Sequence, residues 1–246
     1  MSCPPVFKRY ESTARLRQAV RNHRLLVATG LPVPRLIAVQ PENGMLGFER
    51  IVGRHALDIS DLERVSAQLG RWHWQLAKER HAGDRGSLLR QKIKPFLPAR
   101  AKLLRTLQAP GMLVDGSQAG AVGALAERCP PSIYKDVNVR NVLVGATQIY
   151  HVDFDDLSLA PAGYDLAKLL VSWAMTHGRR PPVETLLTSY NRAAGGELCG
   201  PGVLAVWIEV HHVLTSRYVG RGSYRYQWAA VRTAEDERRA LAALAS

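Results

Sequence analysis

The stretch Tyr134–Leu170 constrains the fold of this chain more than any other part of its sequence. It reads YKDVNVRNVLVGATQIYHVDFDDLSLAPAGYDLAKLL. Two short, mostly β-branched apolar runs, 142–144 and 149–152, flank a turn at Gly145, a pattern that predicts a β-hairpin. A helical pattern begins at Tyr164. The chain is therefore expected to combine strands and helices.

Three oxygen-bearing side chains are expected at one end of this hairpin. Asn141 enters its first strand, Asp153 leaves its second strand, and Asp136 lies in the loop before it. Oxygen ligands suit Mg²⁺, which takes few protein ligands and completes its shell with water and phosphate oxygens. A remaining carboxylate can accept the proton of an attacking hydroxyl, as phosphoryl transfer requires. The alternative is an acidic turn in an ordinary α/β protein, since the spacing D-x₄-N alone is common.

The motif series resembles the aminoglycoside phosphotransferase and choline kinase family of small-molecule kinases. That family typically has H-G-D-x-H-x-x-N, then I-D-F/W, then a Y-D-L-A helix. This chain departs from it at three positions, since Tyr134 and Lys135 replace His-Gly and Asn138 replaces the second His. The resemblance implies a protein-kinase-like α+β fold of two lobes, with a small β-rich N-terminal lobe that lacks the first strands and a mostly helical C-terminal lobe.

The resemblance also implies roles for individual residues. Asp136 matches the catalytic base, and Asn141 and Asp153 match the magnesium ligands. Asp165 matches the acid that braces the catalytic loop. The implied substrates are ATP and a small molecule with a hydroxyl group, with Mg²⁺ as cofactor. Asp155 and its neighbour Asp156 are further candidates for metal or acceptor contacts, and the sequence does not decide between these roles.

The N-terminal part matches the family less well. Lys8 corresponds to the strand lysine that holds ATP phosphates, while the Glu49 carbonyl and the Ile51 amide correspond to the groups that meet adenine. Residues 14–30 contain no acid, and Arg21 stands where the family has a glutamate partner for the lysine. Lys8 is therefore expected to have no intramolecular partner. Its alternative role is that of a solvated lysine at a strand end.

The resemblance also implies the boundaries of both lobes, because residues 49–54 resemble the family's linker between them. Residues 1–52 are expected to form the truncated N-terminal lobe of a strand, a helix and a hairpin, and residues 53–246 the helical lobe, with the catalytic hairpin at 134–156. A Gly-rich and then basic segment, 81–98, is expected to be a solvated face, with an acceptor-binding insert as the alternative. Helices are predicted at 13–28, 58–80, 119–128, 164–175, 183–194, 204–218 and 234–245.

The late helices carry further candidate residues. Glu209 and Arg217 are candidates for the wall that binds the acceptor, on position alone. His211 and His212 are adjacent and so face different directions on a helix, which argues against a dihistidine metal site. His73 lies within an apolar stripe and is expected to be a hydrogen-bonded core residue.

Composition limits the remaining classes. No apolar run is long enough to span a membrane, no signal-peptide core precedes Lys8, and a cytoplasmic protein is expected. Three cysteines without C-x-x-C spacing support neither a disulfide framework nor a zinc site. The formal net charge of +12 favours anionic partners. Scattered arginines without a nucleic-acid-binding signature make nucleic acid an unlikely partner. The charge also counts against a polycationic acceptor such as an aminoglycoside.

Two hypotheses of different classes follow. The first is an ATP-dependent phosphotransferase acting on a small hydroxyl compound. The second is a nucleotide-binding pseudokinase or scaffold without turnover, motivated by the missing glycine-rich loop and the missing helix acid. A start upstream of Met1 would also account for the missing strands. The acceptor cannot be identified from these motifs.

Overall fold

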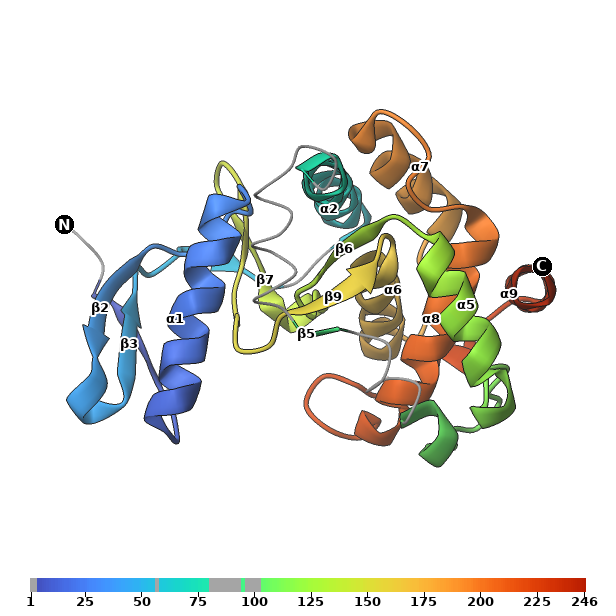
Figure 1. Cartoon of the computed structure of the whole chain (residues 1–246), viewed down its shortest axis with the longest axis horizontal. Coiled ribbons are helices and arrows are strands. Elements are labelled where there is room, and N and C mark those ends of the chain that lie inside the picture. The colour runs from blue at the N-terminus through green and yellow to red at the C-terminus, as the bar shows by residue number, and fades with distance from the viewer. Residues whose placement is uncertain (1–3, 56–57, 80–93, 96–102) are drawn as a thin grey trace.

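The computed structural model describes residues 4–55, 58–79, 94–95 and 103–246 of the chain. A small antiparallel sheet and one helix lie at one end, and most of the helices lie at the other (Figure 1). This is the two-lobed α+β arrangement that the sequence predicts. The boundary at residue 52 stays a prediction, and most of the basic segment 81–98 falls outside the described residues.

The N-terminal part consists of a strand, a helix and a hairpin, as predicted. Its three strands pair in the antiparallel order β1-β3-β2, with Lys8 opposite Leu46. The helix begins after Ser12, whose hydroxyl accepts a hydrogen bond from the Arg15 amide and so satisfies an end group. It lies between this sheet and the hairpin around Gly145 (Figure 1). The elements are β1 (Val6–Arg9), α1 (Thr13–Ala28), β2 (Leu36–Gln40) and β3 (Met45–Phe48).

The hairpin predicted around Gly145 is confirmed. β7 (Val142–Gly145) pairs with β8 (Ile149–His151) in antiparallel register, Val142 opposite His151 and Val144 opposite Ile149. The Val152 amide continues the pairing by donating to the Asn141 carbonyl at 2.9 Å. A two-residue strand, β4 (Gly53–Arg54), adds to the other edge of β7.

A further sheet was not predicted. β9 (Ser158–Pro161) pairs antiparallel with β6 (Pro131–Tyr134) and parallel with β5 (Lys94–Pro95). This sheet holds the two ends of the segment 134–158 together, because β6 leads into the loop of Asp136 and β9 follows the turn after Asp153. It therefore fixes both acidic residues relative to the helices behind them.

The helical part is built around α6 and α8, which are buried over most of their lengths. His73 lies in this core and its Nδ1 is 2.7 Å from the Tyr190 hydroxyl, as expected of a hydrogen-bonded core histidine. The α-helices are α2 (Ile59–Glu79), α5 (Ala119–Arg128), α6 (Tyr164–His177), α7 (Val183–Ala194), α8 (Pro201–Thr215) and α9 (Ala234–Ala245). The short 3₁₀ helices are η1 (Pro41–Asn43), η2 (Gly116–Gln118), η3 (Val139–Asn141), η4 (Ser216–Tyr218) and η5 (Trp228–Ala230). Within the described ranges, no helix is both long and apolar enough to cross a membrane.

Gly70 allows α2 to approach α7 closely. A Cβ atom at this position would lie 2.0 Å from the Tyr190 carbonyl oxygen. Gly70→Ala is therefore expected to lower the free energy of unfolding by about 3 kcal/mol, because the two helices must separate. Denaturant unfolding measures the change.

Gly123→Ala in α5 is the matched control, since a Cβ there meets nothing within 4 Å. It is expected to raise stability by up to about 1 kcal/mol, because alanine favours a helix interior more than glycine does. Equal effects of the two substitutions would contradict the close packing at Gly70.

Candidate active site

Two acidic residues adopt an uncommon backbone conformation. Asp136 has φ 62° and Asp153 has φ 67°, and they are the only non-glycine residues with positive φ in the part of the chain that the structure describes. The left-handed region costs free energy for a side chain with a Cβ. Such conformations persist where surrounding contacts enforce them, and they cluster at functional sites. Two of the residues that the motif singled out, Asp136 and Asp153, thus have this uncommon conformation.

Asp165 holds the loop of Asp136 from behind. Its carboxylate oxygens accept hydrogen bonds from the Lys135 amide at 2.8 Å and the Val137 amide at 3.0 Å. These are the amides on either side of Asp136, so the brace fixes the backbone at that residue. Asp165 is buried, and burial raises its pKa to about 7 although the two amide donors oppose the shift.

The Asp136 carboxylate is surrounded by donors. The Tyr134 hydroxyl donates to Oδ1 at 2.8 Å, Asn138 Nδ2 donates to Oδ2 at 3.2 Å, and Lys168 Nζ lies 3.5 Å from Oδ1. Burial alone would raise the pKa of Asp136. The Lys168 cation and the Tyr134 hydroxyl outweigh it, so that the pKa lies below its usual range. The group is therefore a carboxylate at neutral pH and can accept a proton.

Asn141 is tied to the same loop. Its Nδ2 donates to the Asp136 carbonyl at 2.9 Å, which leaves the side-chain oxygen as the atom that can meet a ligand. The hairpin also links it to the Asp153 segment, through the bond between the Asn141 carbonyl and the Val152 amide. The Asp153 side chain is about half exposed. The predicted ligand pair therefore lies on two neighbouring strand ends.

Lys8 forms ion pairs with the segment that contains Asp153. Its Nζ lies 2.8 Å from Asp153 Oδ1 and 2.7 Å from Asp155 Oδ2, and the Tyr10 hydroxyl donates to Asp155 Oδ1 at 3.1 Å. Burial opposes the charged ammonium, but the two carboxylates prevail and raise the pKa of Lys8. The expectation that Lys8 has no intramolecular partner is wrong, because its partners come from the other lobe and not from α1.

Helix α1 contacts the same segment through a residue that the motif comparison missed. Asn22 is buried, and its Nδ2 donates to the Phe154 carbonyl at 2.7 Å and the Asp155 carbonyl at 2.9 Å. Arg21, at the position compared with the family glutamate, is exposed. The signal for Asn22 was available in the sequence, because an asparagine within the apolar stripe of a helix must find polar partners.

Two buried lysines were also missed. Lys135 Nζ donates to the carbonyls of Val152 and Asp153, and burial lowers the pKa of Lys135 to about 8. Lys168 lies on α6 beside Asp136. The signal for Lys135 was its departure from the family glycine, since a long side chain there must extend toward the hairpin or into solvent. It connects the loop of Asp136 to the strand end of Asp153.

Glu49 and Ile51, which were matched to adenine binding, lie in the segment between β3 and β4. The Glu49 amide donates to the Arg35 carbonyl at 2.9 Å, and Glu49 Oε1 accepts from the Arg35 amide at 2.9 Å. Ile51 is half-buried. No hydrogen bond joins either of them to Lys8 or Asp136 among the described residues. Their roles stay predictions.

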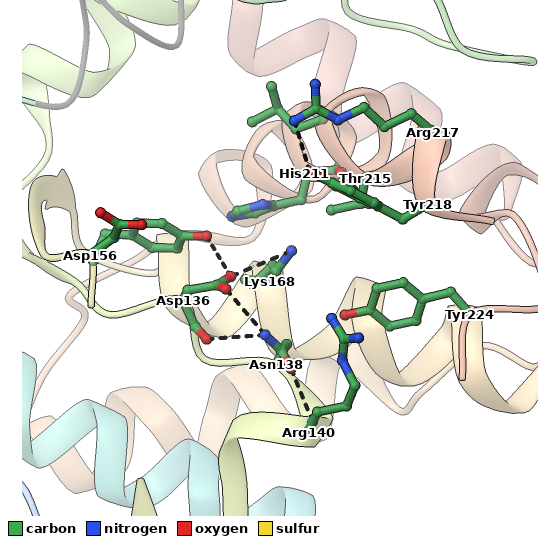
Figure 2. Close-up of a pocket in the computed structure, with 12 residues that line it drawn as sticks. Asp136, Asn138, Arg140, Asp156, Lys168, His211, Thr215, Arg217, Tyr218 and Tyr224 are labelled. Carbon is green, nitrogen blue, oxygen red and sulfur yellow. Dashed lines mark hydrogen bonds and ion pairs between the residues drawn. The ribbon is translucent and has the colours of Figure 1, made fainter. Parts of the chain in front are cut away.

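A cavity of about 400 Å³ opens beside Asp136 on the side of α8 (Figure 2). Arg217 lines it, as expected of the acceptor wall. Glu209 does not, because it is buried behind the wall, where its carboxylate accepts from Trp228 Nε1 at 2.8 Å and Arg232 Nη1 at 2.9 Å. The lining residues are Tyr134, Asp136, Asn138, Arg140, Asp156, Lys168, His211, Leu214, Thr215, Arg217, Tyr218 and Tyr224.

The neighbouring histidines of α8 face apart, as expected. His211 Nε2 lies 3.0 Å from the Tyr164 carbonyl, and His212 Nε2 lies 3.0 Å from the Pro110 carbonyl. Throughout the described ranges, no group of three or more His, Cys, Asp or Glu side chains is arranged to hold a metal ion. The predicted Mg²⁺ site has only one carboxylate and one amide oxygen, so it is not a cluster of this kind. Magnesium takes most of its ligands from water and phosphate.

The profile of the phosphotransferase enzyme family matches residues 4–204. The chain belongs to this family. No curated protein matches the sequence significantly.

Solved structures place this phosphotransferase family member in the same fold. A choline/ethanolamine kinase family protein from Mesorhizobium loti is 19% identical, with a TM-score of 0.58 over 98% of this chain and 86% of the other. The choline kinase of Streptococcus pneumoniae is 16% identical, with a TM-score of 0.55 over 98% and 85%. An aminoglycoside 3'-phosphotransferase of type VIII is 17% identical, with a TM-score of 0.54 over 84% and 83%. At these identities the comparisons establish the protein-kinase-like fold.

Proposed function

We propose that this chain is an ATP-dependent phosphotransferase that moves the γ-phosphate of ATP to a hydroxyl group of a small molecule. The observation that carries the proposal is the arrangement around Asp136. A carboxylate in a strained, braced loop faces a cavity of acceptor size on one side. In the segment that Lys135 joins to this loop, the carboxylates of Asp153 and Asp155 hold the Lys8 ammonium between them. Phosphoryl transfer needs these two features next to each other.

Asp136 is the proposed base. The acceptor hydroxyl would donate its hydrogen to the Asp136 carboxylate while its oxygen attacks the γ-phosphorus. The bond from that phosphorus to the bridging oxygen then breaks, and ADP leaves. The strained loop is braced by Asp165, so little motion is needed when the proton moves. Positioning of this kind supplies a large part of the rate enhancement in such reactions.

Asn141 and Asp153 are the proposed ligands of Mg²⁺. Their oxygens suit a hard cation. The Lys8 ammonium lies between the carboxylates of Asp153 and Asp155, which supports a positive charge at this position. When bound, Mg²⁺ would neutralise charge on the β- and γ-phosphates. A kinase with a similar fold, the amicoumacin kinase, has a structure in complex with AMP-PNP and Ca²⁺, which supports use of a nucleotide and a divalent ion here.

Lys8 is the proposed contact to the ATP phosphates, and the Glu49 carbonyl and Ile51 amide are the proposed contacts to adenine. An ammonium already at the strand end of Asp153 needs only a small displacement to reach a phosphate bound there. An acid on α1 would position the Lys8 side chain. The carboxylates of Asp153 and Asp155 position it instead, at the junction of the lobes. The missing helix acid therefore does not argue against turnover.

Replacing Lys8 tests this role. Lys8→Met is expected to lower turnover by about a hundredfold or more, because one charge that meets the phosphates in the transition state is lost. Lys8→Arg is expected to restore little, since a planar guanidinium does not replace a compact ammonium. Steady-state kinetics with Mg-ATP measure both. If Lys8→Met retained wild-type turnover, Lys8 would not be the contact to the ATP phosphates.

The decisive experiment for the function is Mg-ATP consumption by the purified chain in the presence of hydroxyl acceptors of different classes. Acceptor-dependent release of ADP supports the phosphotransferase. Binding of Mg-ATP without ADP release under every condition supports the alternative, a nucleotide-binding scaffold. Absence of nucleotide binding contradicts both hypotheses.

A further inference from the structure

The cavity beside Asp136 carries more cationic than anionic side chains. Three of its lining residues are cations, Lys168, Arg140 and Arg217, and two are acids, Asp136 and Asp156. Lys168 lies 3.5 Å from the Asp136 carboxylate, so these two charges largely compensate each other. The surplus positive charge of the cavity therefore comes from the two arginines.

Neither arginine is neutralised by an acid in the part of the chain that the structure describes. Across the described ranges, no carboxylate lies within salt-bridge distance of Arg140 or Arg217, in contrast to Arg180 and Arg232, which have two acidic partners each. Arg140 comes from the catalytic loop, and Arg217 comes from η4 at the end of α8 (Figure 2). The two guanidinium groups thus reach the same cavity from different elements.

Both guanidinium groups are positioned by aromatic rings. The Arg140 guanidinium carbon lies 4.9 Å from the centre of the Tyr224 ring, and that of Arg217 lies 4.9 Å from the centre of the Tyr218 ring. Arg217 Nη2 also donates to the Tyr218 hydroxyl at 3.0 Å. Stacking of this kind orders a long side chain before a ligand arrives, which lowers the entropic cost of binding. It leaves most N–H donors of the planar fork available.

We propose that the acceptor is a small hydroxyl compound that carries a phosphate or carboxylate group. Arg140 and Arg217 bind this anionic group while the hydroxyl lies at Asp136. The inference rests on the proposed function and specifies its substrate class. Guanidinium groups bind phosphate and carboxylate through paired hydrogen bonds, and their positive charge disfavours a cationic acceptor such as an amino sugar or a quaternary amine. The net charge of +12 would further speed the arrival of an anion.

Matched acceptors test the proposal on the full chain. Glucose 6-phosphate and gluconate carry the two candidate anions, glucose is the neutral counterpart, and choline and kanamycin are cationic. Calorimetric titration measures binding of each compound, and ADP release with Mg-ATP measures turnover. Both anionic compounds are expected to bind more tightly than glucose, by about tenfold or more. Comparison of the two decides between phosphate and carboxylate.

Arginine substitutions connect the preference to the cavity. Arg140→Met and Arg217→Met are each expected to weaken binding of the preferred anion by about ten- to a hundredfold, while Mg-ATP binding is retained. Arg225→Met is the matched control, because Arg225 is an exposed arginine of the neighbouring loop that does not line the cavity. Arg225→Met also removes one positive charge, and it is expected to leave binding of the anion and of Mg-ATP unchanged.

The possible outcomes distinguish failure of the anionic acceptor from failure of the proposed phosphotransferase activity. Tighter binding or faster turnover of choline, kanamycin or glucose than of either anion overturns the inference and leaves a phosphotransferase. Anion binding that is absent, or that responds equally to all three arginine substitutions, also overturns it. Arginine-dependent anion binding without ADP release from any compound supports the anion site and contradicts the proposed function.

Discussion

Replacing Asp136 by Asn is expected to lower turnover by about a hundredfold to ten-thousandfold. The amide has the shape of the carboxylate and can still accept the hydrogen bond of the Tyr134 hydroxyl. It cannot take up the proton of an acceptor hydroxyl, and it carries no charge to pair with Lys168. Binding of Mg-ATP is expected to persist, because the proposed phosphate contact is Lys8 and the proposed metal ligands are Asn141 and Asp153. Single-turnover kinetics and calorimetry measure the two quantities separately.

Glu127→Gln is the matched control, since Glu127 is an exposed acid on α5 away from the cavity. It is expected to leave turnover unchanged. If Asp136→Asn retained wild-type turnover while the control behaved as expected, Asp136 would not be the base.

The second large effect is expected at Asp153. Asp153→Asn is expected to weaken Mg-dependent nucleotide binding by about a hundredfold, because it removes the one carboxylate of the proposed metal site. Asp155→Asn is the informative comparison. Both acids hold Lys8, at 2.8 and 2.7 Å, but only Asp153 is proposed as a metal ligand. Nucleotide titrations at several Mg²⁺ concentrations measure the difference.

Asp155→Asn is expected to cause a smaller loss that does not depend on Mg²⁺, since Lys8 keeps one carboxylate partner. Equal losses in both variants would indicate that the two acids act through Lys8 rather than through a metal. Thermal unfolding of both variants serves as the check on the fold.

Local patterns in the sequence were enough to predict most elements. The helix 183–194 and the hairpin around Gly145 are confirmed because apolar periodicity and turn residues act over a few positions. The sheet of β6 and β9 was missed because its strands are short, contain prolines and pair across the whole catalytic segment. Such pairing is decided by tertiary contacts that no local pattern records.

Local patterns predicted only part of the candidate site. Asp136, Asn141 and Asp153 stand at fixed spacing within one motif, and the structure brings their segments together. The partners of Lys8 lie 145 and 147 residues away from it, so their contact could not be inferred from spacing. Arg140 was overlooked because it stands at an unspecified position of the motif. Its role depends on a cavity that is lined by residues far apart in the sequence.

A crystal structure of the full chain with AMP-PNP and Mn²⁺ tests the central proposal most directly, because anomalous scattering locates the metal. We expect the manganese peak within ligand distance of the side-chain oxygens of Asn141 and Asp153, with Lys8 moved from Asp153 to a phosphate oxygen. A nucleotide bound with its metal elsewhere, or with the contact between Lys8 and Asp153 intact, would contradict the proposed site.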